Sequence, residues 1–127
     1  MCSHNKNVDD QIKRAAHAID KADAVLIAAG AGIGVDSGLP DYRGTKGFWN
    51  SYQGIGKSSQ SFIELSNVGQ FDDNPQLAWA FYGQQLNQYR AAVPHVGFSH
   101  LLEISKEKTQ DYFVLTSNVD GQFQKAG

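Results

Sequence analysis

Residues 24–34 read AVLIAAGAGIG, an apolar run that opens directly into a glycine-rich turn. The run has no polar alternation, which is typical of a strand buried on both faces of a parallel sheet. Nucleotide-binding α/β folds begin in this way, because glycine lets the backbone approach a pyrophosphate. Val35 stands where the G-x-G-x-x-G pattern has its third glycine, so a plain strand-to-helix turn remains the alternative reading of this segment alone.

A second apolar run, residues 112–116, leads into Ser117-Asn118-Val119-Asp120. Side chains alternate along an extended chain, so Asn118 and Asp120 are expected on the same side at the carboxyl end of this strand. That end is where open α/β sheets bind their ligands. The alternative is that the two polar side chains only cap the strand.

The segments between the two runs predict helices and one long irregular stretch. Apolar spacing predicts a helix over residues 9–21, and Asn74 followed by Pro75 predicts the start of another, which Pro94 ends. A further helix is expected to begin near residue 97. Residues 45–73 are polar and rich in glycine, and so long a stretch is expected to form a functional lid or to contain short helices.

Composition excludes several classes of function. Lys and Arg number 11 against 13 Asp and Glu, so no basic surface indicates nucleic acid. No apolar run approaches the roughly 20 residues that cross a bilayer, so no membrane partner is expected. Cys2 is the only cysteine, which excludes an internal disulfide or a thiolate zinc site and favours a cytoplasmic protein. The histidines have no metal-ligand spacing; they are His4, His17, His95 and His100.

Two longer motifs resemble the signatures of the sirtuin family. Residues 30–44, GAGIGVDSGLPDYRG, are similar to its glycine-alanine-glycine turn followed by Ser-Gly-Ile-Pro-Asp-Phe-Arg. Residues 116–121, TSNVDG, are similar to its Thr-Gln-Asn-Ile-Asp signature, and KAG closes the motif at residues 125–127. Both motifs occur in the family's order, each after a predicted strand, and the resemblance runs from about residue 8 to residue 127.

The resemblance implies an α/β fold, the first part of a Rossmann-like parallel sheet with flanking helices. Residues 1–127 would form the amino-terminal part of an NAD-binding domain, with a cofactor loop and a small helical region over about 45–92. Only two strong core strands are visible, so we expect the carboxyl-terminal part of the domain to be absent from this sequence.

The resemblance also implies roles for the motif residues. Asn118 would hold the ribose and a water, and Asp120 with the Val119 backbone would hold the nicotinamide carboxamide. Tyr42 would cover the nicotinamide pocket, and Arg43 would approach the phosphates. The catalytic candidates are Asn118, Asp120 and Arg43. The cofactor-binding candidates are Gly30, Ala31, Gly32, Ile33, Asp41, Tyr42, Arg43, Ser117, Asn118, Val119 and Asp120.

The sequence departs from the family pattern at several positions. Gly34 replaces a usual Ser, Ser117 a usual Gln, and Phe123 a frequent His. The family's general-base histidine follows the closing Ala-Gly, whereas this sequence ends at Gly127. His95 and His100 precede the second strand and match no catalytic motif. We therefore expect the general base, the acyl-lysine groove and the zinc module to lie outside these residues.

Full-length relatives transfer an acyl group from lysine to the ADP-ribose of NAD and release nicotinamide. The resemblance thus implies NAD as co-substrate and an acyl-lysine protein or peptide as partner. The 127 residues alone are expected to be inactive and to bind NAD weakly or not at all, and an open sheet edge predicts self-association. The alternatives are an NAD glycohydrolase or ADP-ribosyl-transferring enzyme, and a truncated, non-catalytic NAD-binding module.

Overall fold

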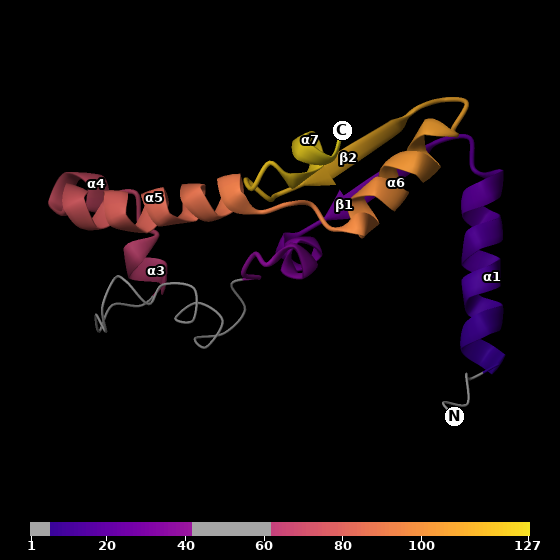
Figure 1. The fold of residues 1–127 in the computed structure, drawn as a ribbon, viewed down its shortest axis with the longest axis horizontal. Coiled ribbons are helices and arrows are strands. Elements are labelled where there is room, and N and C mark those ends of the chain that lie inside the picture. Colours follow the sequence, from indigo (N-terminus) through magenta and orange to yellow (C-terminus); the bar gives the residue numbers. More distant parts are fainter. Residues whose placement is uncertain (1–5, 42–61) are drawn as a thin grey trace.

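The computed structural model describes residues 6–41 and 62–127, which form helices and a small two-stranded parallel sheet (Figure 1). The helices and strands, in chain order, are α1 (Lys6–Lys21), β1 (Val25–Ala29), the 3-10 helix η1 (Ala31–Ser37), α3 (Phe62–Leu65), α4 (Gln70–Asp73), α5 (Pro75–Ala91), α6 (Val96–Lys106), β2 (Tyr112–Thr116) and α7 (Gln122–Ala126).

The two strands pair in parallel, with Val25 opposite Tyr112 and Ala29 opposite Thr116. Their carboxyl ends therefore meet at one edge of the sheet, as expected for an α/β fold. The second strand has the predicted bounds, and the first begins at Val25, one residue later than predicted. The predicted partial Rossmann-like arrangement is thus confirmed for the described residues.

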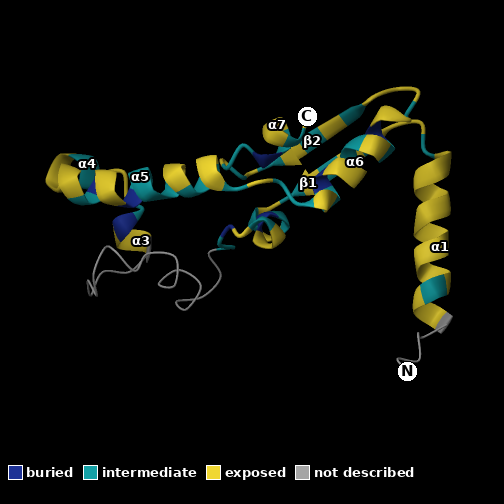
Figure 2. Ribbon diagram, in the orientation of Figure 1, coloured by how far each residue is buried: buried dark blue, intermediate teal, exposed yellow. Residues whose placement is uncertain are grey.

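Within residues 6–41 and 62–127, helices cover one face of this sheet and leave the other uncovered (Figure 2). On the covered face, Ile27 and Val114 line a cavity of about 460 Å³ together with residues of α6 and α7. On the other face, Leu26, Phe113 and Leu115 are 65%, 66% and 59% exposed. The prediction that the first strand is buried on both faces is therefore wrong for the described residues, because no described element packs over the second face.

The helices after residue 61 form a small helical unit. Asn74 caps α5 by accepting a hydrogen bond from the Leu77 amide at 3.2 Å, and Pro75 takes the first helical position, as predicted. The short helices α3 and α4 lie beside α5, which agrees with the expectation of short helices before residue 74. The ring of Phe71 stacks on Tyr82 with centroids 5.4 Å apart. This unit extends from the carboxyl edge of the sheet (Figure 1).

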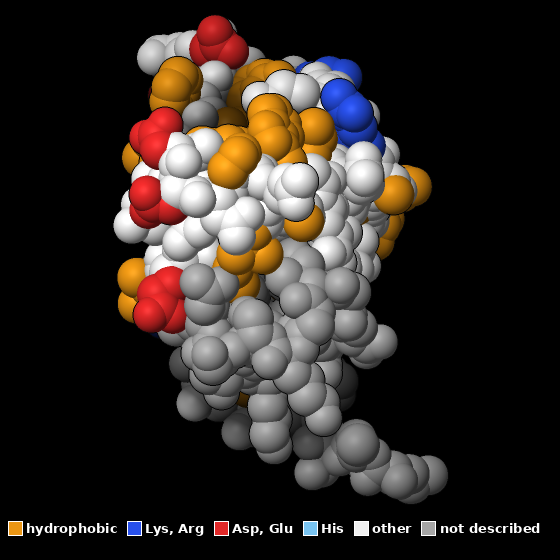
Figure 3. All heavy atoms as spheres, turned by 90° about the vertical axis from the view of Figure 1, so that its left-hand side faces the viewer, with side chains coloured by type: hydrophobic (Ala, Val, Ile, Leu, Met, Phe, Trp, Pro, Cys, Tyr) orange, Lys and Arg blue, Asp and Glu red, His pale blue; other side chains and the backbone are white. Residues whose placement is uncertain are grey.

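The outer end of the helical unit carries apolar side chains next to carboxylates (Figure 3). Its exposed apolar residues include Ile63, Val68 and Trp79. The buried apolar residues are Leu39, Leu65, Ala78, Phe81 and Phe98. The core is thus divided among the helical unit, which holds Leu65, Ala78 and Phe81, the covered face of the sheet, which holds Phe98, and the segment after η1, which holds Leu39.

The first helix extends away from the sheet (Figure 1). It starts at Lys6, three residues before the predicted start, and ends at Lys21 as predicted. Lys108 donates from Nζ to the carbonyl oxygen of Ile19 and so caps the end of α1. Among the helices of residues 6–41 and 62–127, none is both long and apolar enough to span a bilayer.

Candidate functional site

The turn after β1 contains glycines that differ in backbone conformation. Gly30 has an extended backbone (φ −118°, ψ −170°) and starts η1, and Ile33 donates from its amide to the Gly30 carbonyl at 3.2 Å. Gly38 ends η1 with φ 80°, a left-handed conformation that favours glycine. The amide of Gly38 donates to the Val35 carbonyl at 2.9 Å and closes the turn.

The backbone of Gly30 and Gly32 is open toward the surface. A Cβ atom added at either position would meet no described heavy atom within 4 Å, and neither residue has a positive φ. The described fold therefore does not itself require glycine at these two positions. Bare backbone at the start of a helical turn suits the close approach of an anionic ligand such as a pyrophosphate.

The loop after β2 is tied directly to this turn. Asn118 donates from Nδ2 to the Gly30 carbonyl at 2.9 Å, and its own amide donates to Thr116 Oγ1 at 3.1 Å. Asp120 accepts a hydrogen bond on Oδ1 from the Gln122 amide at 2.9 Å. Its Oδ2 lies 3.7 Å from the position that a Cβ on Gly34 would take, so this oxygen faces η1.

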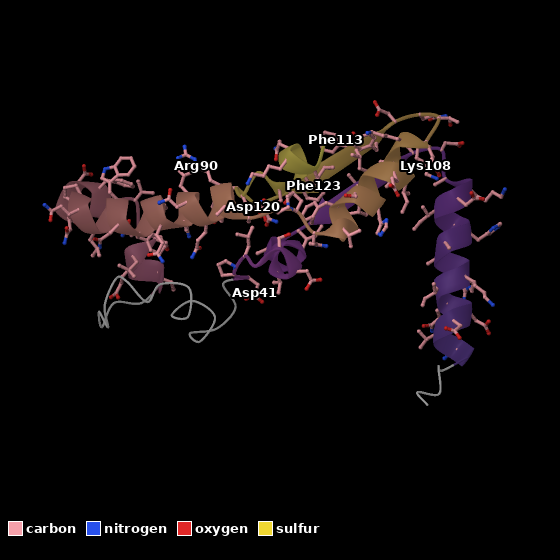
Figure 4. All side chains as sticks on the ribbon, in the orientation of Figure 1. Asp41, Arg90, Lys108, Phe113, Asp120 and Phe123 are labelled. Carbon is pink, nitrogen blue, oxygen red and sulfur yellow. The ribbon has the colours of Figure 1, made fainter. Side chains whose placement is uncertain are left out.

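A pocket of about 190 Å³ lies where the two motifs meet. It is lined by Ala31, Leu39, Pro40, Tyr89, Ser117, Asn118, Val119 and Asp120. Burial alternates along the second motif: Asn118 and Asp120 are half-buried, whereas Ser117 and Val119 are exposed. In Figure 4, Asp120 lies between the end of α5 and η1. The pocket thus combines a carboxylate, an amide and apolar walls at the carboxyl edge of the sheet.

Three lining residues were not among the predicted site residues. Leu39 and Pro40 belong to the first motif, so their place in that motif could have identified them. Tyr89 comes from the last turns of α5, and no sequence signal connects it with either motif. Only the packing of α5 against the second motif brings it to the pocket: Lys125 donates from Nζ to the carbonyl oxygens of Tyr89 and Arg90, both at 2.8 Å.

Other predicted residues lie around the pocket or beyond the described part. Gly30 lines a neighbouring open groove with Ser117. Gly32 and Ile33 belong to η1, and the Ile33 carbonyl faces the His95 ring at 2.9 Å. Asp41 is half-buried at the end of the first described segment. Tyr42, Arg43 and the predicted cofactor loop lie outside the described residues.

The structure shows what surrounds two positions at which the sequence departs from the family pattern, Gly34 and Phe123. Gly34 is buried, and a Cβ there would lie 3.3 Å from both Cβ and Cδ1 of Leu39. Phe123 packs edge-to-face on Phe98 with ring centroids 4.9 Å apart, next to the apolar cavity under the sheet. Phe123 therefore serves packing and does not line the pocket at the motif junction.

Comparison with known proteins identifies relatives of this chain. The sequence model described as "Sir2 family" matches residues 30–127. An NAD-dependent protein deacylase of Leptospira interrogans is 32% identical over 108 residues, covering 85% of this chain and 40% of that protein. NAD-dependent protein deacylase 2 of Pseudomonas aeruginosa is 33% identical over 118 residues, covering 91% of this chain and 44% of its own length.

A solved structure described as "The Structural basis of Sirtuin Substrate Affinity" superimposes with a TM-score of 0.71 at 26% identity. The match covers 91% of this chain and 43% of that one. The chain therefore spans well under half the length of the proteins it matches.

Proposed function

Because this chain belongs to the Sir2 family, we propose that its two motifs form the nicotinamide side of the NAD site in an NAD-dependent protein deacylase. One observation carries the proposal: a single pocket joins Ala31 of the first motif to Asn118 and Asp120 of the second. The names of the relatives, which are NAD-dependent deacylases and deacetylases, supply the reaction class.

The chemistry of the lining residues fits this ligand. The Asp120 carboxylate can accept hydrogen bonds from a carboxamide, and the exposed residue Val119 lines the pocket beside it. The open backbone of Gly30 and Gly32 suits the phosphates. When bound, NAD supplies the bond between nicotinamide and ribose that is broken in the reaction. Pro40 and Tyr89 provide apolar walls that exclude water from that bond.

Further parts of the proposal concern the whole protein. Asn118 holds the ribose and a water, Arg43 assists at the phosphates, and Tyr42 shields the pocket. An acyl-lysine protein or peptide is the second substrate. Residues 1–127 are the amino-terminal part of the NAD-binding domain, and residues 45–92 are its cofactor loop and small helical region. The single cysteine in the sequence favours a cytoplasmic location, which fractionation of cells would test.

Self-association through the sheet belongs to the same proposal. It is supported by the exposed face of Leu26, Phe113 and Leu115 and by the outer strand edges of a sheet whose described part has only β1 and β2.

The pocket can be tested by changing one charge. Asp120→Asn keeps the oxygen that accepts from the Gln122 amide but removes the carboxylate, and Asp111→Asn is its matched control. Asp111 also accepts a backbone N–H on Oδ1, from Tyr112 at 2.8 Å, but lies at the amino end of β2. With nicotinamide or NAD added, we expect NMR shifts of the Ala31 and 117–120 amides in the wild type and in Asp111→Asn. Asp120→Asn is expected to weaken this binding about tenfold.

Shifts confined to other parts of the chain, or equal binding by both variants, would contradict the proposed pocket. The reaction class requires a separate measurement on the longest product of the gene. Release of nicotinamide that depends on an acetyl-lysine peptide supports a deacylase. Release without any peptide would indicate a glycohydrolase instead.

A further inference from the structure

His95 lies between α5 and α6 and contacts the glycine turn from outside the pocket. Its Nδ1 accepts a hydrogen bond from the Gly97 amide at 3.0 Å, and its Nε2 lies 2.9 Å from the carbonyl oxygen of Ile33. Its own backbone amide donates to Ser37 Oγ at 3.0 Å. One residue therefore holds both the first turn of η1 and its last residue.

The two ring contacts require one protonation state. A nitrogen that accepts from an amide carries no proton, so Nδ1 is bare. In a neutral ring the proton then lies on Nε2, which donates to the Ile33 carbonyl. The Nε2–H tautomer thus satisfies both contacts. The Nδ1–H tautomer would lose both, and a doubly protonated ring would lose the Gly97 contact.

The His95 ring packs closely against Gly97 and Phe98 of α6. A Cβ on Gly97 would lie 2.5 Å from His95 Cε1, so a side chain at position 97 would displace the imidazole. Phe98 contacts the ring edge-to-face with centroids 5.0 Å apart. Phe98 is itself buried against Phe123 of the second motif. The ring is therefore fixed from the α6 side while it holds η1 on the other.

We propose that His95 is a positioning residue for the nucleotide site. Its Nε2–H and its backbone amide anchor η1 on the amino end of α6, and this sets where the open backbone of Gly30 and Gly32 stands relative to Asn118. The residue touches backbone groups of the protein and not the ligand. The inference rests on the proposed function only for the identity of the ligand whose site is positioned.

Two substitutions separate the two ring contacts. In His95→Asn the side-chain oxygen takes the place of Nδ1, so the Gly97 contact is kept and the Ile33 contact is lost. In His95→Gln the amide nitrogen reaches the place of Nε2, so the Ile33 contact is kept and the Gly97 contact is lost. His100→Asn is the matched control, because the His100 side chain is 64% exposed and lies on the outer surface of α6.

The ligand-free 127-residue chain gives the primary readouts. We expect the nitrogen chemical shifts of the wild-type His95 ring to report a protonated Nε2 and a bare Nδ1. Amide hydrogen exchange over residues 33–38 is expected to be about fivefold faster in His95→Asn and unchanged in His95→Gln and His100→Asn. A ring protonated on Nδ1, or equal exchange of η1 in all three variants, would overturn the proposal.

A binding measurement connects this anchor to the pocket. His95→Asn is expected to weaken nicotinamide or NAD binding about fivefold, and His95→Gln by less than about twofold. Equal binding by His95→Asn and the wild type would overturn the positioning role. If neither the wild-type chain nor the longest product of the gene shows binding at residues 117–120, the proposed function fails, whereas the ring tautomer and the exchange of η1 still decide whether His95 anchors the turn.

Discussion

Asn118 donates from Nδ2 to the carbonyl oxygen of Gly30 at 2.9 Å, which joins the loop after β2 to the turn after β1. The two residues belong to different motifs, and each follows one of the two adjacent parallel strands. The bond fixes the two sides of the candidate pocket relative to each other.

Replacing this donor should loosen the junction. Asn118→Asp removes the N–H group and sets a carboxylate against the Gly30 carbonyl, so the free energy of unfolding is expected to fall by about 1 kcal/mol. The matched control is Asn67→Asp, because Asn67 Oδ1 accepts from the Gly69 amide at 2.9 Å and an aspartate keeps that bond. Urea denaturation of both variants measures the difference. A loss of stability in Asn67→Asp as large as in Asn118→Asp would refute the explanation.

Two glycines of the turn should respond differently to a methyl group. Gly34→Ala crowds Leu39, which lies 3.3 Å from the added Cβ, and should cost about 1 kcal/mol of stability. Gly32→Ala meets no described atom within 4 Å, so its stability should stay within about 0.5 kcal/mol of the wild type. Thermal unfolding gives both values.

The Gly32→Ala variant also tests ligand binding, because its fold should stay as stable as that of the wild type. If the open backbone at Gly32 receives the phosphates, Gly32→Ala should weaken NAD binding about tenfold or more while the fold is unchanged. Isothermal titration or NMR shifts measure this. Undiminished binding by Gly32→Ala would show that the ligand approaches the turn elsewhere.

Lys125 should stabilise the end of α5. Its Nζ donates to the carbonyls of Tyr89 and Arg90 at 2.8 Å and of Ala92 at 2.9 Å, groups that a helix leaves unpaired at its end. Lys125→Met is expected to lower the free energy of unfolding by about 1 kcal/mol, a modest value because the side chain is exposed. Lys13→Met on the exposed surface of α1 is the control and should have little effect in the same denaturation experiment. Equal losses in the two variants would argue against the cap.

The uncovered sheet face predicts concentration-dependent association. Phe113→Lys places a charge among Leu26 and Leu115 and should keep the chain monomeric at concentrations where the wild type associates. Val68→Lys, which changes an exposed apolar residue far from the sheet, should associate like the wild type. Sedimentation velocity over a range of concentrations distinguishes them. A wild-type chain that stays monomeric throughout would contradict self-association.

Several elements could be predicted because their signals are local. The apolar run at 112–116 has polar residues on both sides, and Asn74, Pro75 and Pro94 mark the limits of α5 by backbone chemistry alone. The helix α1 starts three residues before the predicted start, because Lys6 and Asn7 are polar and give no apolar signal. Burial of the strand faces could not be predicted, because it depends on which elements pack over them.

The site could be predicted only in part, because some of its residues are brought together by the packing of separate elements. The motif residues Ala31, Asn118 and Asp120 could be named from their patterns, and the structure brings them to one pocket. Tyr89 reaches the pocket, and His95 reaches the turn beside it, through the packing of α5 and α6, and neither belongs to a motif. The double contact of the His95 ring depends on atoms of residues 33 and 97, a relationship that only the folded chain establishes.

The parallel pairing of Val25 with Tyr112 also determines when the pocket can exist during folding. The strands are far apart in the chain, so their pairing requires closure of a long loop, a step that slows folding relative to helix formation. The helices can form earlier, but the two walls of the pocket meet only when the strands pair. A compound that occupies the pocket would therefore bind the paired state and shift the folding equilibrium toward it.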